Sequence, residues 1–119
     1  MDDKDEVGRR GEQLAVDHLT AAGWRILDRN WRCARGELDV VALDGGVLVV
    51  VEVKTRSGLG WGHPLEAVDA RKLTRLRVLA GLWRDAHPGR GRGAARIDVV
   101  SIVLPRRAEP VIDHLRALA

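Results

Sequence analysis

The feature that most constrains the fold is a pair of β-rich runs, residues 36–44 and 47–54, separated by Gly45 and Gly46. Both central residues of a type I′ turn need a positive φ, which glycine adopts at little cost. The runs therefore predict a β-hairpin with a two-residue loop. This loop also sets the register, because cross-strand partners then have residue numbers that sum to 91.

Charged side chains gather at the open end of this hairpin. The register places Asp39 opposite Glu52 and Glu37 opposite Lys54, with all four on one face. The other face, which begins with Leu38, is apolar throughout, as expected for a central strand pair covered on both sides. Two carboxylates opposed across a ladder, roughly 5 Å apart at Cβ, destabilise a sheet unless something compensates them. The alternatives are a shared proton, a neighbouring cation such as Lys54, or a bound divalent ion.

A hard divalent cation suits these residue types best. Two carboxylates with water suit Mg²⁺ or Mn²⁺, and the hairpin contains no His or Cys that would favour zinc. The simpler alternative is that Glu52 and Lys54 form a solvated group at a frayed strand end. Five consecutive apolar residues run directly into this pair and another acid lies opposite, so the metal site is the preferred interpretation.

The motifs around the hairpin resemble those of a known family. Asp39, followed after the hairpin by Glu52-Val53-Lys54, is similar to the D…(D/E)-x-K core of the restriction-endonuclease-like nucleases. With its flanking motifs it resembles the YraN-like family of small bacterial proteins, which is itself similar to archaeal Holliday-junction resolvases. Those motifs are Gly8-x-x-Gly11-Glu12, Gly36-Glu37-Leu38-Asp39, Val51-Glu52-Val53-Lys54-Thr55-Arg56 and Arg96-Ile97-Asp98-Val99-Val100. The likeness spans about residues 8–115, with Leu38 where the name of the superfamily has proline.

This resemblance implies a fold, a reaction and roles for individual residues. The fold is a single α/β domain over residues 1–119, with a central mixed sheet of about five strands flanked by helices. The reaction is endonucleolytic hydrolysis of phosphodiester bonds in branched or structured DNA, with Mg²⁺ or Mn²⁺ as cofactor. Asp39, Glu52 and the carbonyl of Val53 would hold the ion. Lys54 would orient the attacking water, and Glu12 would complete the catalytic group.

Four cationic side chains are the candidate nucleic-acid contacts, each of which would otherwise be an ordinary solvated cation. They are Arg35, Arg56, Lys72 and Arg75. The first stands in a basic loop, residues 32–36, beside the carboxylates, and the second opens a glycine-rich loop. The last two lie on a helix expected over residues 65–86, where Lys72 resembles the family's lysine that faces the substrate phosphate. Trp61, in the glycine-rich loop, would stack on a base or pack as an ordinary tryptophan.

The rest of the chain supplies the elements that frame this site. Apolar residues at helical spacing predict a first helix over residues 6–22, ended by Gly23, with Glu12 on the flank of its apolar stripe. Further strands are expected over residues 24–31, 96–104 and 110–115. Residues 1–6 are expected to fray, and the glycine-rich segment 87–95 is expected to be a flexible loop.

Composition limits the other possibilities. A chain of 119 residues suits one domain, and no apolar run reaches the roughly 18 residues that a membrane helix needs. The acidic opening and the single cysteine, Cys33, favour a cytoplasmic protein, and one cysteine forms no intrachain disulfide. A net charge of +3 alone does not identify a nucleic-acid partner.

Two other functions stay open on the sequence. A non-catalytic nucleic-acid-binding module would keep the same fold and use the acids as a metal site without turnover. A protein-interaction role predicts neither stabilisation by divalent metals nor salt-dependent binding to DNA. Likeness to junction resolvases, which act on symmetric substrates with paired sites, suggests a homodimer.

Overall fold

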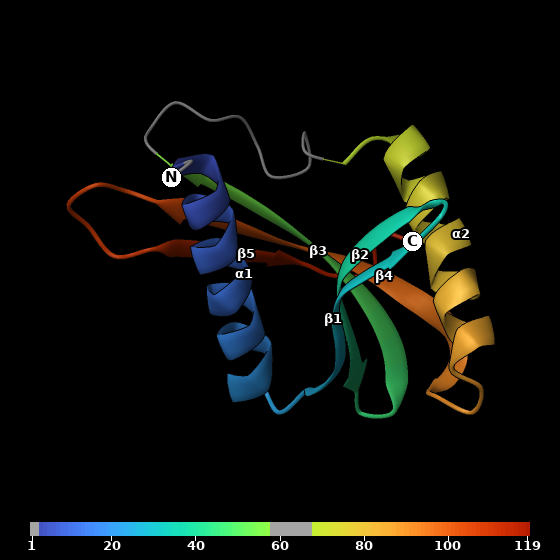
Figure 1. The fold of residues 1–119 in the computed structure, drawn as a ribbon. Coiled ribbons are helices and arrows are strands. Elements are labelled where there is room, and N and C mark those ends of the chain that lie inside the picture. Colours follow the sequence, from blue (N-terminus) through green and yellow to red (C-terminus); the bar gives the residue numbers. More distant parts are fainter. Residues whose placement is uncertain (1–2, 58–67) are drawn as a thin grey trace.

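The computed structural model describes residues 3–57 and 68–119 and places their strands in one mixed sheet (Figure 1). The elements are α1 (Asp3–Ala21), β1 (Arg25–Cys33), β2 (Gly36–Asp44), β3 (Val47–Ser57), α2 (Ala70–Ala86), β4 (Arg92–Leu104) and β5 (Val111–Leu115). The strands follow one another across the sheet in sequence order, with β3 and β4 parallel and the other neighbours antiparallel. The predicted α/β fold with a five-stranded mixed sheet is confirmed. Neither helix in the described ranges is long and apolar enough to cross a membrane.

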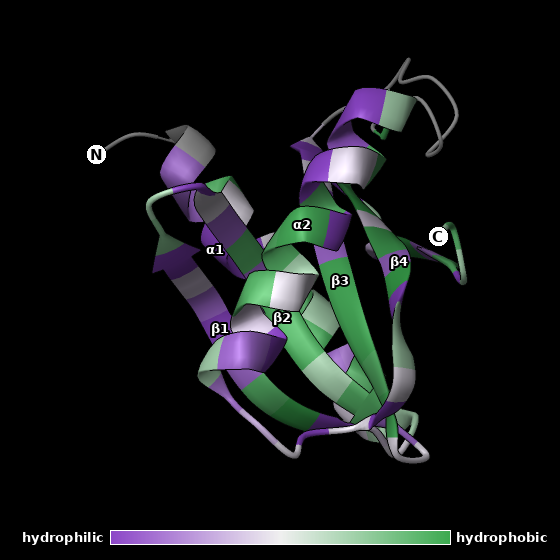
Figure 2. Ribbon diagram, turned by 90° about the vertical axis from the view of Figure 1, so that its right-hand side faces the viewer, coloured by the Kyte–Doolittle hydropathy of each residue, from purple (hydrophilic) through white to green (hydrophobic). Residues whose placement is uncertain are grey.

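The middle strands are buried on both faces of the sheet. α1 covers one face and α2 covers the other, and hydrophobic residues run along β2 and β3 behind α2 (Figure 2). The α1 side includes Ala15, Leu19, Val40, Ala42, Val49 and Val51, and the α2 side includes Val41, Leu48, Val50, Leu76, Leu79 and Trp83. Strands buried in this way contain little but apolar residues, which explains the long valine-rich runs of the sequence.

The hairpin of β2 and β3 has the predicted turn and the predicted register over its first five pairs. Gly45 and Gly46 have φ angles of 57° and 90°, as a type I′ turn requires. The ladder runs from Asp44–Val47 to Val40–Val51, and each pair sums to 91. Local turn chemistry was therefore sufficient to predict this part of the sheet.

Beyond Val40 and Val51, β2 and β3 separate, although each remains paired with its outer neighbour. The predicted ladder pairs Asp39–Glu52 and Glu37–Lys54 are therefore wrong. The backbone N–H of Val53 donates to Oδ2 of Asp39 at 2.9 Å, in place of the strand-to-strand bond that a continued ladder would make. The sheet thus splits at its charged end.

The side-chain alternation of β2 shifts at the same point. Leu38 was expected on the face of Val40, yet it packs with Val41 on the α2 side. In the neighbouring β1, Asn30 lies between Arg29 and Trp31, the partners of Val40 and Leu38, and has a φ of 52°. Asparagine tolerates this left-handed conformation better than most residues. This local irregularity in both strands accompanies the split.

The first helix packs tightly against the sheet at Gly11. A Cβ atom there would stand 1.9 Å from Oγ1 of Thr55, so only glycine lets the helix approach β3 this closely. Since Thr55 directly follows Lys54, the contact brings the neighbouring Glu12 to the charged end of the sheet. The glycine of the Gly11-Glu12 motif thus has a packing role.

Several boundaries in the first half differ from the predictions. α1 begins at Asp3, so residues 3–6, which were expected to fray, are part of the helix, and residues 1–2 lie outside the described residues. β1 continues to Cys33, which reduces the predicted basic loop to a two-residue turn. Arg56 belongs to β3 and not to a loop, because pairing with β4 extends the strand to Ser57. The glycine-rich loop that follows, with Trp61, lies outside the described residues.

The second helix begins at Ala70, later than predicted. Asp69 has extended backbone angles, and its side chain accepts a hydrogen bond from the backbone N–H of Lys72 at 2.8 Å. This is the geometry of an N-cap, which satisfies one of the free donors of the first turn. The cap places Lys72 in the first turn of α2.

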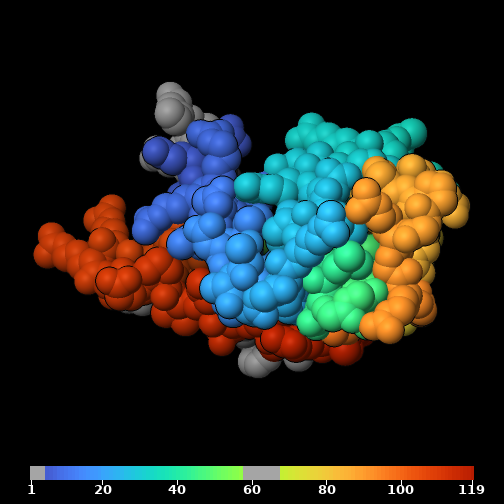
Figure 3. Space-filling model, turned by 90° about the horizontal axis from the view of Figure 1, so that it is seen from below, coloured from blue at the N-terminus to red at the C-terminus, as the bar shows by residue number. Residues whose placement is uncertain are grey.

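The prediction of a flexible loop over residues 87–95 is wrong for its second half, because β4 begins at Arg92. The backbone N–H of Arg92 donates to the carbonyl of Gly46 at 2.9 Å, and its guanidinium donates to that of Gly45 at 2.8 Å. A Cβ at Gly91 would stand 2.7 Å from Cβ of Leu48. The glycine-rich segment therefore packs on the hairpin turn (Figure 3, orange against green).

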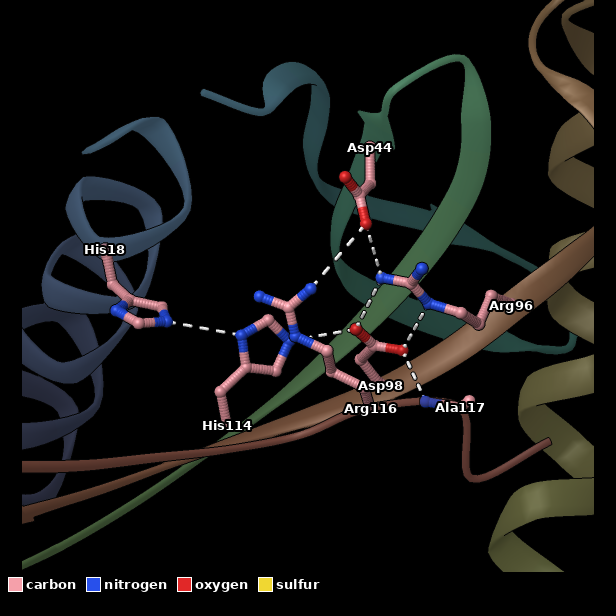
Figure 4. Close-up of polar contacts among 7 residues, drawn as sticks. All are labelled: His18, Asp44, Arg96, Asp98, His114, Arg116 and Ala117. Atoms are coloured by element: carbon pink, nitrogen blue, oxygen red, sulfur yellow. Dashed lines mark hydrogen bonds and ion pairs between the residues drawn. The ribbon is translucent and has the colours of Figure 1, made fainter. Parts of the chain in front are cut away.

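A buried carboxylate ties the end of the chain to β4 (Figure 4). Asp98 is fully buried and accepts two hydrogen bonds from Arg96, at 2.9 and 3.0 Å. It also accepts one from the backbone N–H of Ala117 at 2.9 Å, and Nε2 of His114 lies 2.8 Å away. Buried carboxylates need such partners.

The same cluster reaches α1 and the hairpin turn. Arg96 also pairs with Asp44 at 3.0 Å, and Nδ1 of His114 lies 3.2 Å from Nε2 of His18 (Figure 4). Burial, with the nearby His114 and Arg116, lowers the pKa of His18 below its ordinary value. The end of the sheet opposite to the split is thus held by a connected polar network.

Replacing Gly11 by alanine should destabilise the protein by about 1–3 kcal/mol, the usual cost of overpacking. The reason is the contact with Thr55, whose Cβ would stand 2.6 Å from the new methyl group. Gly8→Ala is the matched control, because a Cβ there meets nothing within 4 Å and alanine favours the helix. Urea denaturation measures both, and equal stability of the two variants would contradict this account of the helix contact.

Replacing Asp98 by asparagine should cost about 3 kcal/mol or more, because it leaves Arg96 without its buried partner. The exposed Asp113→Asn, on the adjacent β5, serves as control and should change stability by less than about 0.5 kcal/mol. Thermal denaturation compares the two. A similar small effect of both substitutions would show that the cluster does not hold the C-terminal segment.

Candidate active site

Three of the four predicted catalytic residues meet where β2 and β3 part. Asp39 comes from β2, and Glu52 and Lys54 come from β3. Two hollows open there: an α2-side hollow of about 370 Å³ and an α1-side hollow of about 350 Å³. Glu37, Asp39, Val53 and Lys54 line both. Asp39 and Lys54 are therefore accessible from both faces of the sheet, whereas Glu52 lines only the α2-side hollow.

The carboxyl groups of Asp39 and Glu52 lie within hydrogen-bonding reach of each other. Burial, followed by the charge of Glu52, raises the pKa of Asp39 from 3.8 to about 7, although the N–H of Val53 acts in the opposite direction. A proton held by this pair is one of the compensations that the sequence had left open. Two adjacent acids in a buried setting remain an unfavourable arrangement at neutral pH.

Lys72 supplies a second compensation. Its ammonium group pairs with Oε2 of Glu52, a buried residue. The sequence interpretation had Lys72 facing a substrate phosphate, whereas the structure places it on the acid pair, inside the α2-side hollow. The N-cap at Asp69 fixes the start of α2, and this start places Lys72, in the first turn, within reach of Glu52.

Glu12 lines the α1-side hollow together with Asp39 and Lys54. Its Oε1 accepts hydrogen bonds from Nδ2 of Asn30 at 2.7 Å and from Arg29 at 3.2 Å. Sequence reasoning missed Asn30. The only available signal was an asparagine inside a predicted strand, a residue type that adopts positive φ more readily than most.

Lys54 lines both hollows, and within residues 3–57 and 68–119 its ammonium has no ion-pair partner. Glu37 was expected opposite Lys54 in the hairpin register, but Glu37 instead pairs with Arg32 across the β1–β2 ladder at 3.1 Å. The split explains this change, because Glu37 stays with β1 while Lys54 stays with β4. The lysine is thus available to a ligand in the split.

The predicted nucleic-acid contacts lie in different places. Lys72 and Arg75 line the α2-side hollow, and Arg35 shares a third hollow with Arg75. Arg56 lines none of these three hollows and interacts with other groups of the protein. Arg9, which the sequence analysis did not single out, lines the α1-side hollow.

The donor set suits a hard divalent ion that keeps several waters. In the part of the chain that the structure describes, no three or more His, Cys, Asp or Glu side chains are arranged to hold a metal. Asp39 and Glu52 provide two neighbouring carboxylates, and Mg²⁺ commonly binds proteins through only one or two carboxylates. The ammonium of Lys72 on Glu52 shows that this position attracts a cation.

Comparisons with known proteins give one consistent answer. The family model described as "Uncharacterised protein family UPF0102" matches residues 11–102. A UPF0102 protein of Clavibacter michiganensis is 53% identical over 117 residues, which cover 98% of each chain. One of Streptomyces coelicolor is 51% identical over 120 residues, covering 100% of this chain and 92% of the other. The matched range includes Asp39, Glu52 and Lys54.

Asp39→Asn should stabilise the protein in EDTA at pH 8. The pKa of Asp39 is about 7 in the folded protein and 3.8 ordinarily, so the folded state holds a proton that the unfolded state has already lost between these pH values. The stability contributed by this proton is therefore fully present below pH 4 and is lost as the pH rises through 7. The variant lacks that loss, and its amide oxygen still accepts from Val53. We expect a melting temperature at least about 4 °C above wild type at pH 8, and little difference at pH 4.

Thermal denaturation across this pH range provides the measurement, with Asp113→Asn as the control for removing a carboxylate. An Asp39→Asn variant that is no more stable than wild type at pH 8 would contradict the repulsion between Asp39 and Glu52.

Proposed function

The chain belongs to the UPF0102 family, and we propose that it is a divalent-metal-dependent endonuclease that hydrolyses phosphodiester bonds. The observation that carries the proposal is the pair Asp39 and Glu52 at an accessible split in the sheet, beside Lys54, which forms no ion pair with any of the described residues. An acid such as Asp39, whose pKa is raised by burial and by a neighbouring charge, is typical of a functional site. The preference for branched or structured DNA rests on the resemblance to junction resolvases.

Asp39 and Glu52 would hold Mg²⁺ or Mn²⁺, with the carbonyl of Val53 as a further donor. When bound, the ion would act as a Lewis acid on the phosphodiester and activate a water. The N–H of Val53 fixes the carboxylate of Asp39 through its 2.9 Å hydrogen bond. A cation held by Glu52 would replace the ammonium of Lys72, which would then be released toward the substrate phosphate.

The remaining residues would act on the substrate directly. Lys54 would orient the attacking water and offset the negative charge that develops at phosphorus, since its ammonium is not engaged by an acid of the described chain. Glu12, held by Asn30, would act from the α1-side hollow. Arg35, Arg56 and Arg75 would contact the nucleic-acid backbone.

One observation favours a second candidate function, a nucleic-acid-binding module without turnover. The ion pair of Lys72 with Glu52 balances the acid pair from within the fold, so the site is compatible with a protein that binds no metal. The cytoplasmic location is proposed from the composition of the chain, and the homodimer from the resemblance to junction resolvases. Light scattering tests the dimer.

Calorimetric titration with Mg²⁺ and Mn²⁺ separates the two functions. The double variant Asp39→Asn/Glu52→Gln should lose metal binding, whereas Glu37→Gln, an exposed acid that also lines both hollows, should retain it. Metal binding that survives in the double variant would place the ion elsewhere, and a wild type that binds no metal would leave only the binding module.

Cleavage of branched and linear DNA with Mn²⁺ then tests turnover. Lys54→Ala should keep metal affinity but lower the rate by at least about 100-fold, because the lysine acts on the transition state and not on the ion. Metal binding without cleavage of any substrate by the wild type would reject the nuclease and support the binding module.

A further inference from the structure

A third hollow, of about 240 Å³, lies beside the α2-side hollow, and none of the described residues that line it is acidic. Its lining consists of Arg35, Arg71, Thr74, Arg75, Val78 and Leu79. We call it the arginine hollow. Arg75 and Leu79 also line the α2-side hollow, so the two cavities adjoin along α2.

Three guanidinium groups converge in the arginine hollow. Arg35, Arg71 and Arg75 are all exposed, and none has an ion-pair partner among the described residues. Guanidinium groups stay charged at any working pH and repel one another. In contrast, arginines such as Arg29 and Arg96 are matched with carboxylates. An unmatched cluster of this kind has the charge that an anionic ligand requires.

The helix presents this cluster as one stripe. Arg71, Thr74, Arg75 and Val78 recur at spacings of three and four residues, so they lie along one side of α2. Arg35 contributes from the turn between β1 and β2. Val78 is 38% exposed, although it is a large apolar residue. Charged, hydroxyl and apolar groups in one row suit a polymer that alternates phosphates with sugars and bases.

We propose that the arginine hollow binds the nucleic-acid strand on one side of the phosphate that is cleaved at the Asp39–Glu52 site. The inference rests on the proposed function and adds a second phosphate subsite, in which Arg71 is the outer contact. Arg75, which lines both hollows, contacts the strand between the two subsites. No divalent ion is needed here, because the guanidinium groups supply the positive charge. A substrate that extends toward Arg35 therefore binds more tightly than one that ends at the acid pair.

Binding of fluorescent single-stranded and branched DNA in EDTA, followed by anisotropy over a range of salt concentrations, tests this subsite. Arg71→Gln and Arg35→Gln should each weaken binding by about fivefold or more and reduce the slope of log K against log salt by about 0.7–0.9, the value for one lost phosphate contact. Arg77→Gln is the matched control. It removes the same charge from an exposed position of α2 that lines none of the three hollows.

Two results would overturn the subsite: equal losses for Arg71→Gln and Arg77→Gln, or no DNA binding by the wild type in EDTA. Circular dichroism and melting of each variant exclude unfolding as the cause of a loss. The nuclease proposal fails separately. Hollow-dependent binding without cleavage in Mn²⁺ would remove the nuclease and keep the subsite, whereas cleavage with unchanged affinity of Arg71→Gln would remove the subsite alone.

Discussion

The repulsion between Asp39 and Glu52 is the constraint to which the surrounding structure responds. β2 and β3 pair only until these acids would stand opposite each other, and beyond that point each strand relies on its outer neighbour. The separation frees the N–H of Val53 for the carboxylate of Asp39 and admits the ammonium of Lys72 to Glu52. An open, charged split inside a hydrophobic sheet is the result.

Both helices are attached so that they supply groups to this split. α1 meets β3 through the glycine at position 11, which carries Glu12 to one side, and the Asp69 cap starts α2 where Lys72 reaches the other. The opposite end of the sheet is held firmly by the buried Asp98 and by Arg92 on the hairpin turn. A rigid end and an open end are what a site needs if its geometry is to be kept while a ligand enters.

Predictions from sequence were accurate where the determining interactions are local. The glycine turn led to the register because φ preferences act within two residues, and the alternation of β3 identified both buried faces. Predictions failed where a distant segment intervenes. The glycine-rich stretch before β4 has the composition of a loop, yet Arg92 pairs it to the hairpin turn. Asn30 of β1 holds Glu12 of α1, and no pattern near either residue indicates that contact.

The sequence by itself determined the hairpin, its turn and the placement of Asp39, Glu52 and Lys54 at one end, because turn geometry and strand alternation depend only on neighbouring residues. The tertiary structure decided that the ladder divides, that Lys72 rather than Lys54 neutralises Glu52, and that arginines from a turn and a helix share one hollow. Those outcomes depend on which remote side chains meet and on the free energy of burying their charges together, which one stretch of sequence does not contain.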